Sequence, residues 1–449
     1  MTTGLRREMR FWDVVLFLVA AVVGLRWIAT AAAAGPSSLV IWVIAFGAFF
    51  VPLATTVIHL SARFPEEGGL YVWVRHAFGD FAGFMTGWLY WTSNLVYLPG
   101  LLYFSAANAL YIGGASWQSL ADSSVYFIAF SLTGLALAVG LNVVGLGVGK
   151  WLHNAGGLGT WIPVVLLVGM GAIALARFGP GALDAGGLTP DTGIGDVVFW
   201  STIAFGFAGL ETASLMSGEI VDAERTIPRA ILTSGAIITG IYLLGTAAVL
   251  VALPAGEVSS LQGILQAIDA TGDRVGFPGA AAAAAVLITI GNVGGVGAWL
   301  AATARLPFVA GLDRSLPPAF SRLHPRWGTP HVALIVQAIG GAIFVVLGQA
   351  GTGVQGAYDA LVGIGVISYF IPFLLLFAAM IKLGRGRPVG RALAGLGLTV
   401  TAISIALAAL PPEGSTRPAL AVLKVVGSSA ALVAVGAALV ARSRAAARV

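Results

Sequence analysis

The first long apolar run of the chain is interrupted in the stretch Val22-Val23-Gly24-Leu25-Arg26-Trp27, which continues into alanines and ends at Gly35-Pro36. A second interruption reads Ala204-Phe205-Gly206-Phe207-Ala208-Gly209-Leu210-Glu211. Both stretches place glycine and one charged residue in the middle of an apolar segment. Glycine weakens a helix and a charge disfavours burial in hydrocarbon, so two matched interruptions call for a structural reason.

The composition places the whole chain in a membrane. Of its 449 residues, 58% are hydrophobic and only 10% are charged, and the mean hydropathy is +0.93. An ordinary soluble domain is about 25% charged, so a soluble enzyme, a secreted scaffold and a nucleic-acid binder are all disfavoured. The chain has no cysteine, which excludes disulfides and thiolate metal sites. We expect a single transmembrane domain over residues 1–449.

Twelve apolar runs are long enough to be membrane-spanning helices. Their expected positions are 12–34, 38–60, 81–112, 125–148, 158–176, 196–219, 230–252, 279–304, 331–349, 357–381, 391–410 and 419–441. The third run is long enough for a tilted or extended helix. The sequence therefore predicts an all-α integral membrane protein with 12 transmembrane helices.

The basic residues are divided very unequally between the two sides of this topology. With twelve spans, 19 of the 24 lysines and arginines fall on the side of the N-terminus and four on the opposite side. The positive-inside rule then predicts that both termini are cytoplasmic, in the plasma membrane of the cell. Arg26 is the remaining basic residue, and it lies inside the first span.

The two interruptions stand five helices apart, in corresponding halves of the chain. Such pairs are typical of transporters built from inverted repeats, in which unwound segments bind the substrate. Unwinding exposes N–H groups that favour a carboxylate and C=O groups that favour an ammonium, so together they suit a zwitterion. In the alternative interpretation, Gly24, Gly206 and Gly209 only allow close helix packing.

Several motifs, in chain order, resemble those of the amino acid–polyamine–organocation (APC) superfamily. They are FPEEGGLYVW at 64–73, AFG at 77–79, FAGLE at 207–211, GEI at 218–220, TIPRA at 226–230, LDRSLP at 312–317 and GTP at 328–330. They are distributed over most of the chain. The segments KWL at 150–152 and GTWIP at 159–163 are similar to the amino-acid antiporter and polyamine-permease branches.

The resemblance implies a LeuT-like fold with discontinuous helices 1 and 6. Helices 1–5, at about 12–176, and helices 6–10, at about 196–381, would be inverted repeats, with helices 11 and 12 peripheral at about 391–441. The substrate would bind near the midplane between helices 1, 3, 6 and 8. The implied substrate-binding residues are Gly24, Leu25, Arg26 and Trp27 for the carboxylate, Phe205 as an aromatic gate, Gly206, Phe207, Ala208 and Gly209 for the ammonium, Asn94 as a wall, and Trp299 closing the cytoplasmic side.

The chain departs from the family pattern at two places. Leu25, Arg26 and Trp27 replace a small Gly-Ser-Gly-like run, so either the pocket is narrow or Arg26 points away from it. Pro163 stands where some proton-coupled relatives carry a lysine that substitutes for sodium. Coupling by that lysine device is therefore not expected, and coupling to a proton or to Na⁺ by another route stays open.

Arg26 and Glu211 are the two charges near the midplane, and the sequence allows several roles for them. If they lie side by side they form an internal ion pair, and Glu211 stays ionised. If they lie apart, Glu211 becomes a protonatable coupling group, and Arg26 either binds a substrate carboxylate or lines the cavity. A cluster of aromatic residues on the third span is interpreted as interface belt or packing: Trp88, Tyr90, Trp91 and Tyr97.

These inferences favour a secondary transporter that moves an amino acid by alternating access, as an exchanger or a proton-coupled symporter. A polyamine or other organic cation is the alternative substrate, disfavoured because Glu211 is the one acid available in the spans. A non-transporting nutrient sensor or a channel is the alternative of another class. No enzyme motif such as Gly-x-Ser-x-Gly or His-Glu-x-x-His is present. We expect no bound cofactor or metal, no nucleic acid, a small-molecule substrate and the lipid bilayer as partners; the oligomeric state stays open.

Overall fold

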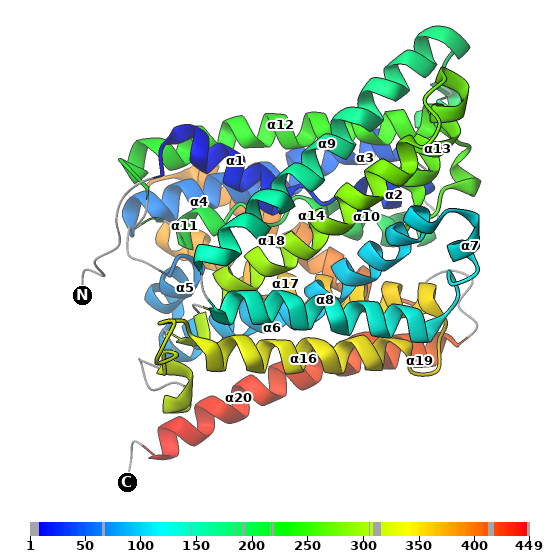
Figure 1. The fold of residues 1–449 in the computed structure, drawn as a ribbon. Coiled ribbons are helices and arrows are strands. Elements are labelled where there is room, and N and C mark those ends of the chain that lie inside the picture. Colours follow the sequence, from blue (N-terminus) through cyan, green and yellow to red (C-terminus); the bar gives the residue numbers. More distant parts are fainter. Residues whose placement is uncertain are drawn as a thin grey trace.

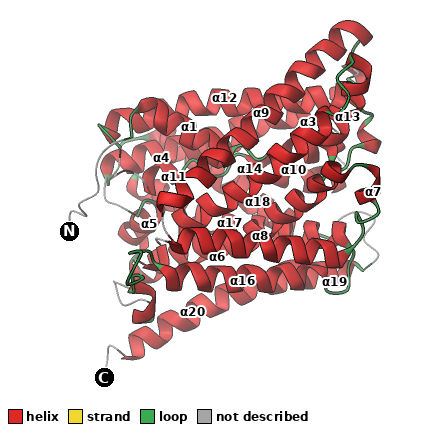
Figure 2. Cartoon of the chain, viewed as in Figure 1, coloured by secondary structure: helices red, strands yellow, loops and turns green. Residues whose placement is uncertain are grey.

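A computed structural model describes residues 9–64, 68–144, 146–183, 185–190, 194–215, 217, 220–304, 306–308, 316–411 and 417–446. For residues 146–157, 185–186, 194–198 and 443–446 it describes the backbone alone. Within these ranges the chain is built from helices and connecting loops, and the extended pairing is limited to one isolated bridge between Met9 and Ile220 (Figure 2). The predicted all-α class is confirmed.

Ten helical segments of the described chain are long and apolar enough to cross a bilayer. They are Ser37–Arg63 (α3, η1 and α4), Asp80–Gly113 (α6 and η2), Ser124–Val144 (α8), Leu158–Phe178 (within α9, Leu146–Phe178), Ala223–Ala252 (α12), Ala280–Phe308 (with α14, Ala280–Thr303), His331–Gln349 (α16), Val354–Leu383 (α17), Pro388–Ala408 (α18) and Pro418–Arg442 (α19, η7 and the first part of α20). Each corresponds to one predicted span.

The first predicted span is a broken helix. It consists of α1 (Phe11–Val22) and α2 (Leu25–Ala33), whose axes differ in direction by 46°. The two residues between them, Val23 and Gly24, have extended backbones with ψ of 105° and 115°. An extended pair cannot continue the i to i−4 hydrogen bonds of a helix, so the predicted interruption is present.

The second predicted interruption is also present. Helix α10 (Ile194–Gly206) ends in a turn, and α11 (Thr212–Leu215) follows as a single helical turn. Gly209 in this turn has φ of +126°, which side chains other than glycine's rarely adopt. Neither α10 nor α11 is long enough to span a bilayer alone, so the total of twelve spans stays a prediction.

Shorter helices cap the bundle. They are α5 (Leu70–Phe78), α7 (Ala115–Gln118) and α13 (Gly263–Val275), with the 3-10 turns η3 (Ala185–Leu188), η5 (Ala255–Glu257) and η6 (Pro318–Ser321). The described chain begins and ends at the same end of the bundle, and α7 and α13 lie at the other (Figure 1). This arrangement agrees with an even number of spans.

Close packing joins helices that are far apart in the sequence. Gly159 of α9 faces Gly291 of α14, and a Cβ on Gly159 would lie 2.3 Å from the carbonyl oxygen of Leu287. Trp42 of α3 stacks on Tyr242 of α12 with 4.1 Å between ring centroids. Small residues at one contact and aromatic rings at another thus fix the scaffold around the two broken helices.

Candidate functional site between two broken helices

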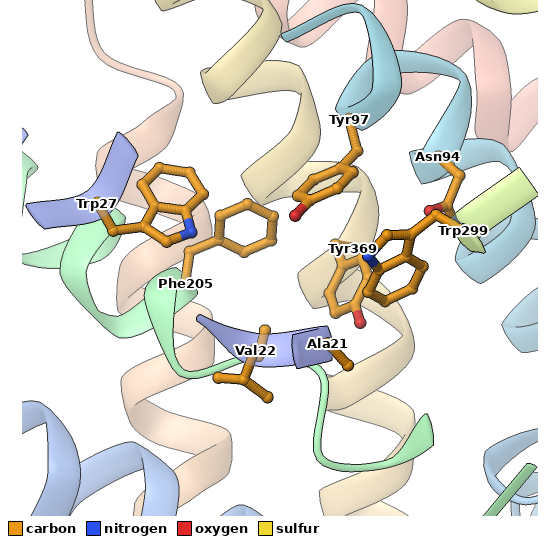
Figure 3. A pocket seen from close by; sticks show the side chains of 9 residues that line it. Ala21, Val22, Trp27, Asn94, Tyr97, Phe205, Trp299 and Tyr369 are labelled. Atoms are coloured by element: carbon orange, nitrogen blue, oxygen red, sulfur yellow. The ribbon is translucent and has the colours of Figure 1, made fainter. Parts of the chain in front are cut away.

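A small cavity lies between the two broken helices (Figure 3). Its lining residues come from α1, α2, α6, α10, α14 and α17 and from the turn after α10: Ala21, Val22, Trp27, Asn94, Tyr97, Phe205, Ala208, Trp299 and Tyr369. The free volume is about 20 Å³, room for about one water molecule. The side chains therefore close over the site, and an organic ligand can enter only when they move.

Aromatic rings form most of the wall. Trp27 and Phe205 meet edge to face at 5.4 Å between centroids, and Phe205 meets Tyr369 in the same way at 5.5 Å. Tyr97 and Trp299 lie 5.6 Å apart on another part of the wall (Figure 3). Rings with two rotatable bonds can swing out as units, so the wall is suited to open and close around an apolar group.

Helix ends of opposite polarity meet at this cavity. Helices α1 and α10 end at Val22 and Gly206, and the last carbonyl groups of a helix carry partial negative charge. Helix α2 begins at Leu25, and the first N–H groups of a helix carry partial positive charge. Ala21 and Phe205 on the negative ends and Trp27 on the positive end all line the cavity.

One hydroxyl group connects the two helix breaks. Tyr242 of α12 places its Oη 2.8 Å from the carbonyl oxygens of both Val22 and Gly206, and its single proton is shared between them. The same Oη accepts a hydrogen bond from the Gly24 N–H at 3.2 Å. Three backbone groups that unwinding would leave unsatisfied in the membrane therefore share one side chain.

Arg26 is buried beside the cavity, with 2% of its surface exposed. Its Cζ lies 4.3 Å from the centroid of the Trp27 ring and 4.5 Å from that of Tyr97. Among the described residues, its Nε has no hydrogen-bond partner and the guanidinium has no acidic partner. Two cavity-lining rings thus separate a permanent positive charge from the site and stabilise it by cation–π contact.

Glu211 is fully buried and has partners of its own. Its Oε1 accepts hydrogen bonds from Tyr369 at 2.5 Å and Tyr90 at 2.9 Å, and its Oε2 accepts one from the Gly209 N–H at 3.1 Å. All three donors are neutral. The alternative in which Arg26 and Glu211 form an internal ion pair is not realised, because Arg26 turns toward aromatic rings and hydroxyl groups satisfy the carboxylate.

The sequence matches the amino acid permease family over residues 9–438. The chain belongs to the amino acid permease family. This match confirms the resemblance to the APC superfamily that the motifs indicated, and it makes the protein a transporter rather than an enzyme.

Relatives of this permease carry transporter names. An uncharacterized transporter of Legionella pneumophila is 29% identical, over 85% of this chain and 82% of its own. The probable agmatine/putrescine antiporter AguD of Lactococcus lactis is 21% identical over 85% and 81% of the two chains. The serine/threonine exchanger SteT of Bacillus subtilis is 23% identical over 85% and 84%.

A solved structure establishes the fold of the permease. The crystal structure of MhsT in complex with L-phenylalanine matches with a TM-score of 0.59, covering 97% of this chain and 100% of that one at 14% identity. The similarity confirms the predicted LeuT-like fold. The two broken helices of the permease are the discontinuous helices that this fold requires.

The permease brings together five residues that the sequence placed at the site: Trp27, Asn94, Phe205, Ala208 and Trp299. The other predicted residues lie behind the wall. Gly24 is in the first break, and Leu25 and Arg26 are in the first turn of α2. Gly206 is the last residue of α10, and Gly209 lies within the second break. Phe207 is fully buried against Trp42. The break in the first span therefore ends before Leu25, and Trp27 is helical rather than unwound.

Four wall residues of the permease were not predicted as site residues: Ala21, Val22, Tyr97 and Tyr369. Tyr97 follows Asn94 by three positions on α6, so helical spacing would have placed the two on one face. Tyr97 was interpreted as belt or packing, and in the structure its ring packs on Trp299 and also lines the cavity. Tyr369 and the bridging Tyr242 have no local sequence signal, because their partners come from remote helices.

Proposed function

We propose that this permease moves a zwitterionic amino acid across the plasma membrane by alternating access. One observation carries the proposal: two helix C-termini and one helix N-terminus meet at a single cavity. The carbonyl ends of α1 and α10 attract an ammonium group, and the N–H end of α2 attracts a carboxylate. An α-amino acid carries both groups on one carbon atom, which suits such a compact site.

In this proposal, the wall residues bind the rest of the substrate. Asn94 uses its Nδ2 to donate to the Tyr90 carbonyl at 2.9 Å, which leaves Oδ1 as the acceptor of that side chain. The rings of Tyr97, Phe205 and Trp299 surround the side chain of the amino acid. The closed cavity is too small for any amino acid, so binding requires these rings to move, and their closure behind the substrate supplies a gate.

A polyamine is less suited to this site. None of the nine lining residues is acidic, and Arg26 places a positive charge behind Trp27 and Tyr97. A polycation would therefore need Glu211 as its counter-charge. Both carboxylate oxygens of Glu211 already accept hydrogen bonds, and the side chain is fully buried.

The proposal also gives Glu211 the role of proton acceptor in transport. No cation neutralises this carboxylate among the described residues, whereas two hydroxyl groups from α6 and α17 contact it. A hydroxyl can accept as well as donate a hydrogen bond, so Tyr90 and Tyr369 can satisfy either form of Glu211. A proton on Glu211 would then change the bonding between the turn after α10 and the helices α6 and α17.

Ligand binding and exchange test the proposal in sequence. Purified protein is heated with each of the amino acids and with spermidine, because a ligand of the native state raises Tm by mass action. An amino acid that raises Tm is then loaded into proteoliposomes for counterflow. We expect exchange of the labelled compound against the unlabelled one. Stabilisation by spermidine alone would overturn the substrate class, and binding without exchange would indicate a sensor.

A further inference from the structure

A second cavity lies at the end of the bundle that holds both termini. It has a volume of about 300 Å³, and its lining residues come from α4, from α17 and from the loop between α17 and α18: His59, Leu60, Ala62, Arg63, Met380, Leu383, Gly384, Arg385 and Arg387. This basic cavity is far larger than the free space of the site between the broken helices. Nothing in the proposed transport function uses it.

The charge of the basic cavity is uniformly positive. Arg63, Arg385 and Arg387 line it, and none of the lining residues is acidic. The ion pairs between described residues involve Arg75 and Arg225, neither of which lines this cavity. Three guanidinium groups that have no acidic partner among the described residues, gathered around one open space, favour an anionic ligand.

The position of the basic cavity indicates the source of the anion. Spans Ser37–Arg63 and Val354–Leu383 end at it, and span Pro388–Ala408 begins beside it. Three apolar spans therefore reach the headgroup level of the bilayer at this place. Leu60, Met380 and Leu383 supply an apolar floor, and Val389 at the start of α18 is 72% exposed. A phosphate with acyl chains fits this combination better than a free phosphate does.

We propose that the basic cavity binds the phosphate headgroup of an anionic phospholipid. The phosphate is bound by three arginines: Arg63 at the end of α4, and Arg385 and Arg387 in the loop after α17. The acyl chains lie along the exposed apolar surface of α18. Basic pockets between transmembrane helices are known to bind such headgroups. The bound lipid would tie α4 to the loop between α17 and α18.

Lipid titration of the purified, intact protein tests the proposal. The probes are short-chain phosphatidylglycerol, short-chain phosphatidylcholine and inorganic phosphate, and the readout is the Kd from the shift in Tm. The test variant is Arg385→Gln with Arg387→Gln. The matched control is Arg322→Gln with Arg326→Gln, which removes the same charge from exposed positions. Both lie in the segment between η6 and α16, at the same end of the bundle.

We expect phosphatidylglycerol to bind the unmodified protein and the control variant equally, and to bind the test variant about thirtyfold more weakly. This factor corresponds to about 1 kcal/mol for each of two basic residues near a membrane surface. Three results would overturn the proposal: equal losses in both variants, equal binding of phosphatidylcholine, or equal binding of inorganic phosphate. If the double variant does not fold, Arg63→Gln replaces it, with the same expected direction and the same three overturning results.

Discussion

At the scale of single residues, Arg26 is the side chain whose role the structure narrows most. Arg26 has no acidic partner among the described residues, so its replacement leaves no buried carboxylate without its counter-charge. We expect Arg26→Met to keep a folded protein with Tm changed by less than about 4 °C. The Kd of the amino acid substrate should rise at least about tenfold, because the positive charge behind Trp27 and Tyr97 is lost.

Arg26→Lys is the control for this prediction. It keeps the charge but lacks the planar group that stacks on both rings. The Kd of the amino acid substrate should therefore lie between that of the unmodified protein and that of Arg26→Met. Thermal unfolding in detergent and ligand titration measure the two effects separately. Loss of folded protein in Arg26→Met would contradict the assignment, since it would show that the charge has a structural partner.

Glu211 carries the prediction on pH. Glutamine has no carboxyl group that can take up a proton, so Glu211→Gln should flatten the dependence of uptake on pH. Its amide oxygen can keep the hydrogen bond from the Gly209 N–H while its amide nitrogen donates to the Tyr90 and Tyr369 hydroxyls, which can accept. Tyr369→Phe removes a donor but keeps the carboxylate, and it should retain the pH dependence. If Glu211→Gln keeps the original pH profile of uptake, the proposed role of Glu211 as a proton acceptor is contradicted.

The residues of the site divide into those that the sequence could predict and those that it could not. Gly24, Arg26, Gly209 and Glu211 stand out because glycine and charge are unusual inside an apolar run. The hydroxyl groups around Glu211 come from α6 and α17, and no local pattern links positions so far apart in the chain. The direction of Arg26 was equally open, because two aromatic rings and one carboxylate compete for the same cation.

At the scale of helices, Tyr242 of α12 is the contact that joins both interruptions. Tyr242→Phe removes one oxygen and leaves the carbonyls of Val22 and Gly206 and the Gly24 N–H without this partner. Each buried unsatisfied group costs about 1–3 kcal/mol, so we expect a fall in Tm of at least about 4 °C. Transport should fall about tenfold or more, because both broken helices lose their common anchor.

Tyr126→Phe is the matched control for the helix contact. Its hydroxyl donates to the Ala106 carbonyl at 2.9 Å, away from the two breaks. The chemical change is identical, and the expected fall in Tm is about 1–3 °C with transport retained. Comparable effects of the two substitutions on uptake would show that Tyr242 contributes ordinary stability rather than control of the breaks.

The helices themselves follow from the apolar runs more directly than the breaks do. Ten described segments fall where hydropathy places them, since 20 apolar residues in a bilayer have few alternatives to a helix. The break in the first span is shorter than expected: α2 starts at Leu25 and includes Trp27. Leu25, Arg26 and Trp27 all tolerate a helix, and Gly24 alone marks the position where it stops.

At the scale of the whole molecule, the fold does not determine which end of the bundle faces the cytoplasm, but the distribution of charge predicts it. The described chain begins and ends at one end of the bundle, and the predicted topology places most of the lysines and arginines on that side. The chain has no cysteine, so a single introduced cysteine can report its side of the membrane without background. Suitable exposed positions are Ser116 of α7 and Arg326 in the loop before α16, at opposite ends of the bundle.

We expect a membrane-impermeant maleimide added to intact cells to label Ser116→Cys and not Arg326→Cys. Permeabilised cells should label both, which shows that each cysteine is accessible. The physical reason is the excess of 19 basic residues over four, which the positive-inside rule places in the cytoplasm. The opposite labelling would show that the predicted orientation is wrong and that both ends of the described chain face the outside of the cell. It would also move the basic cavity from the inner to the outer leaflet, so this experiment bears on the lipid site as well as on the direction of transport.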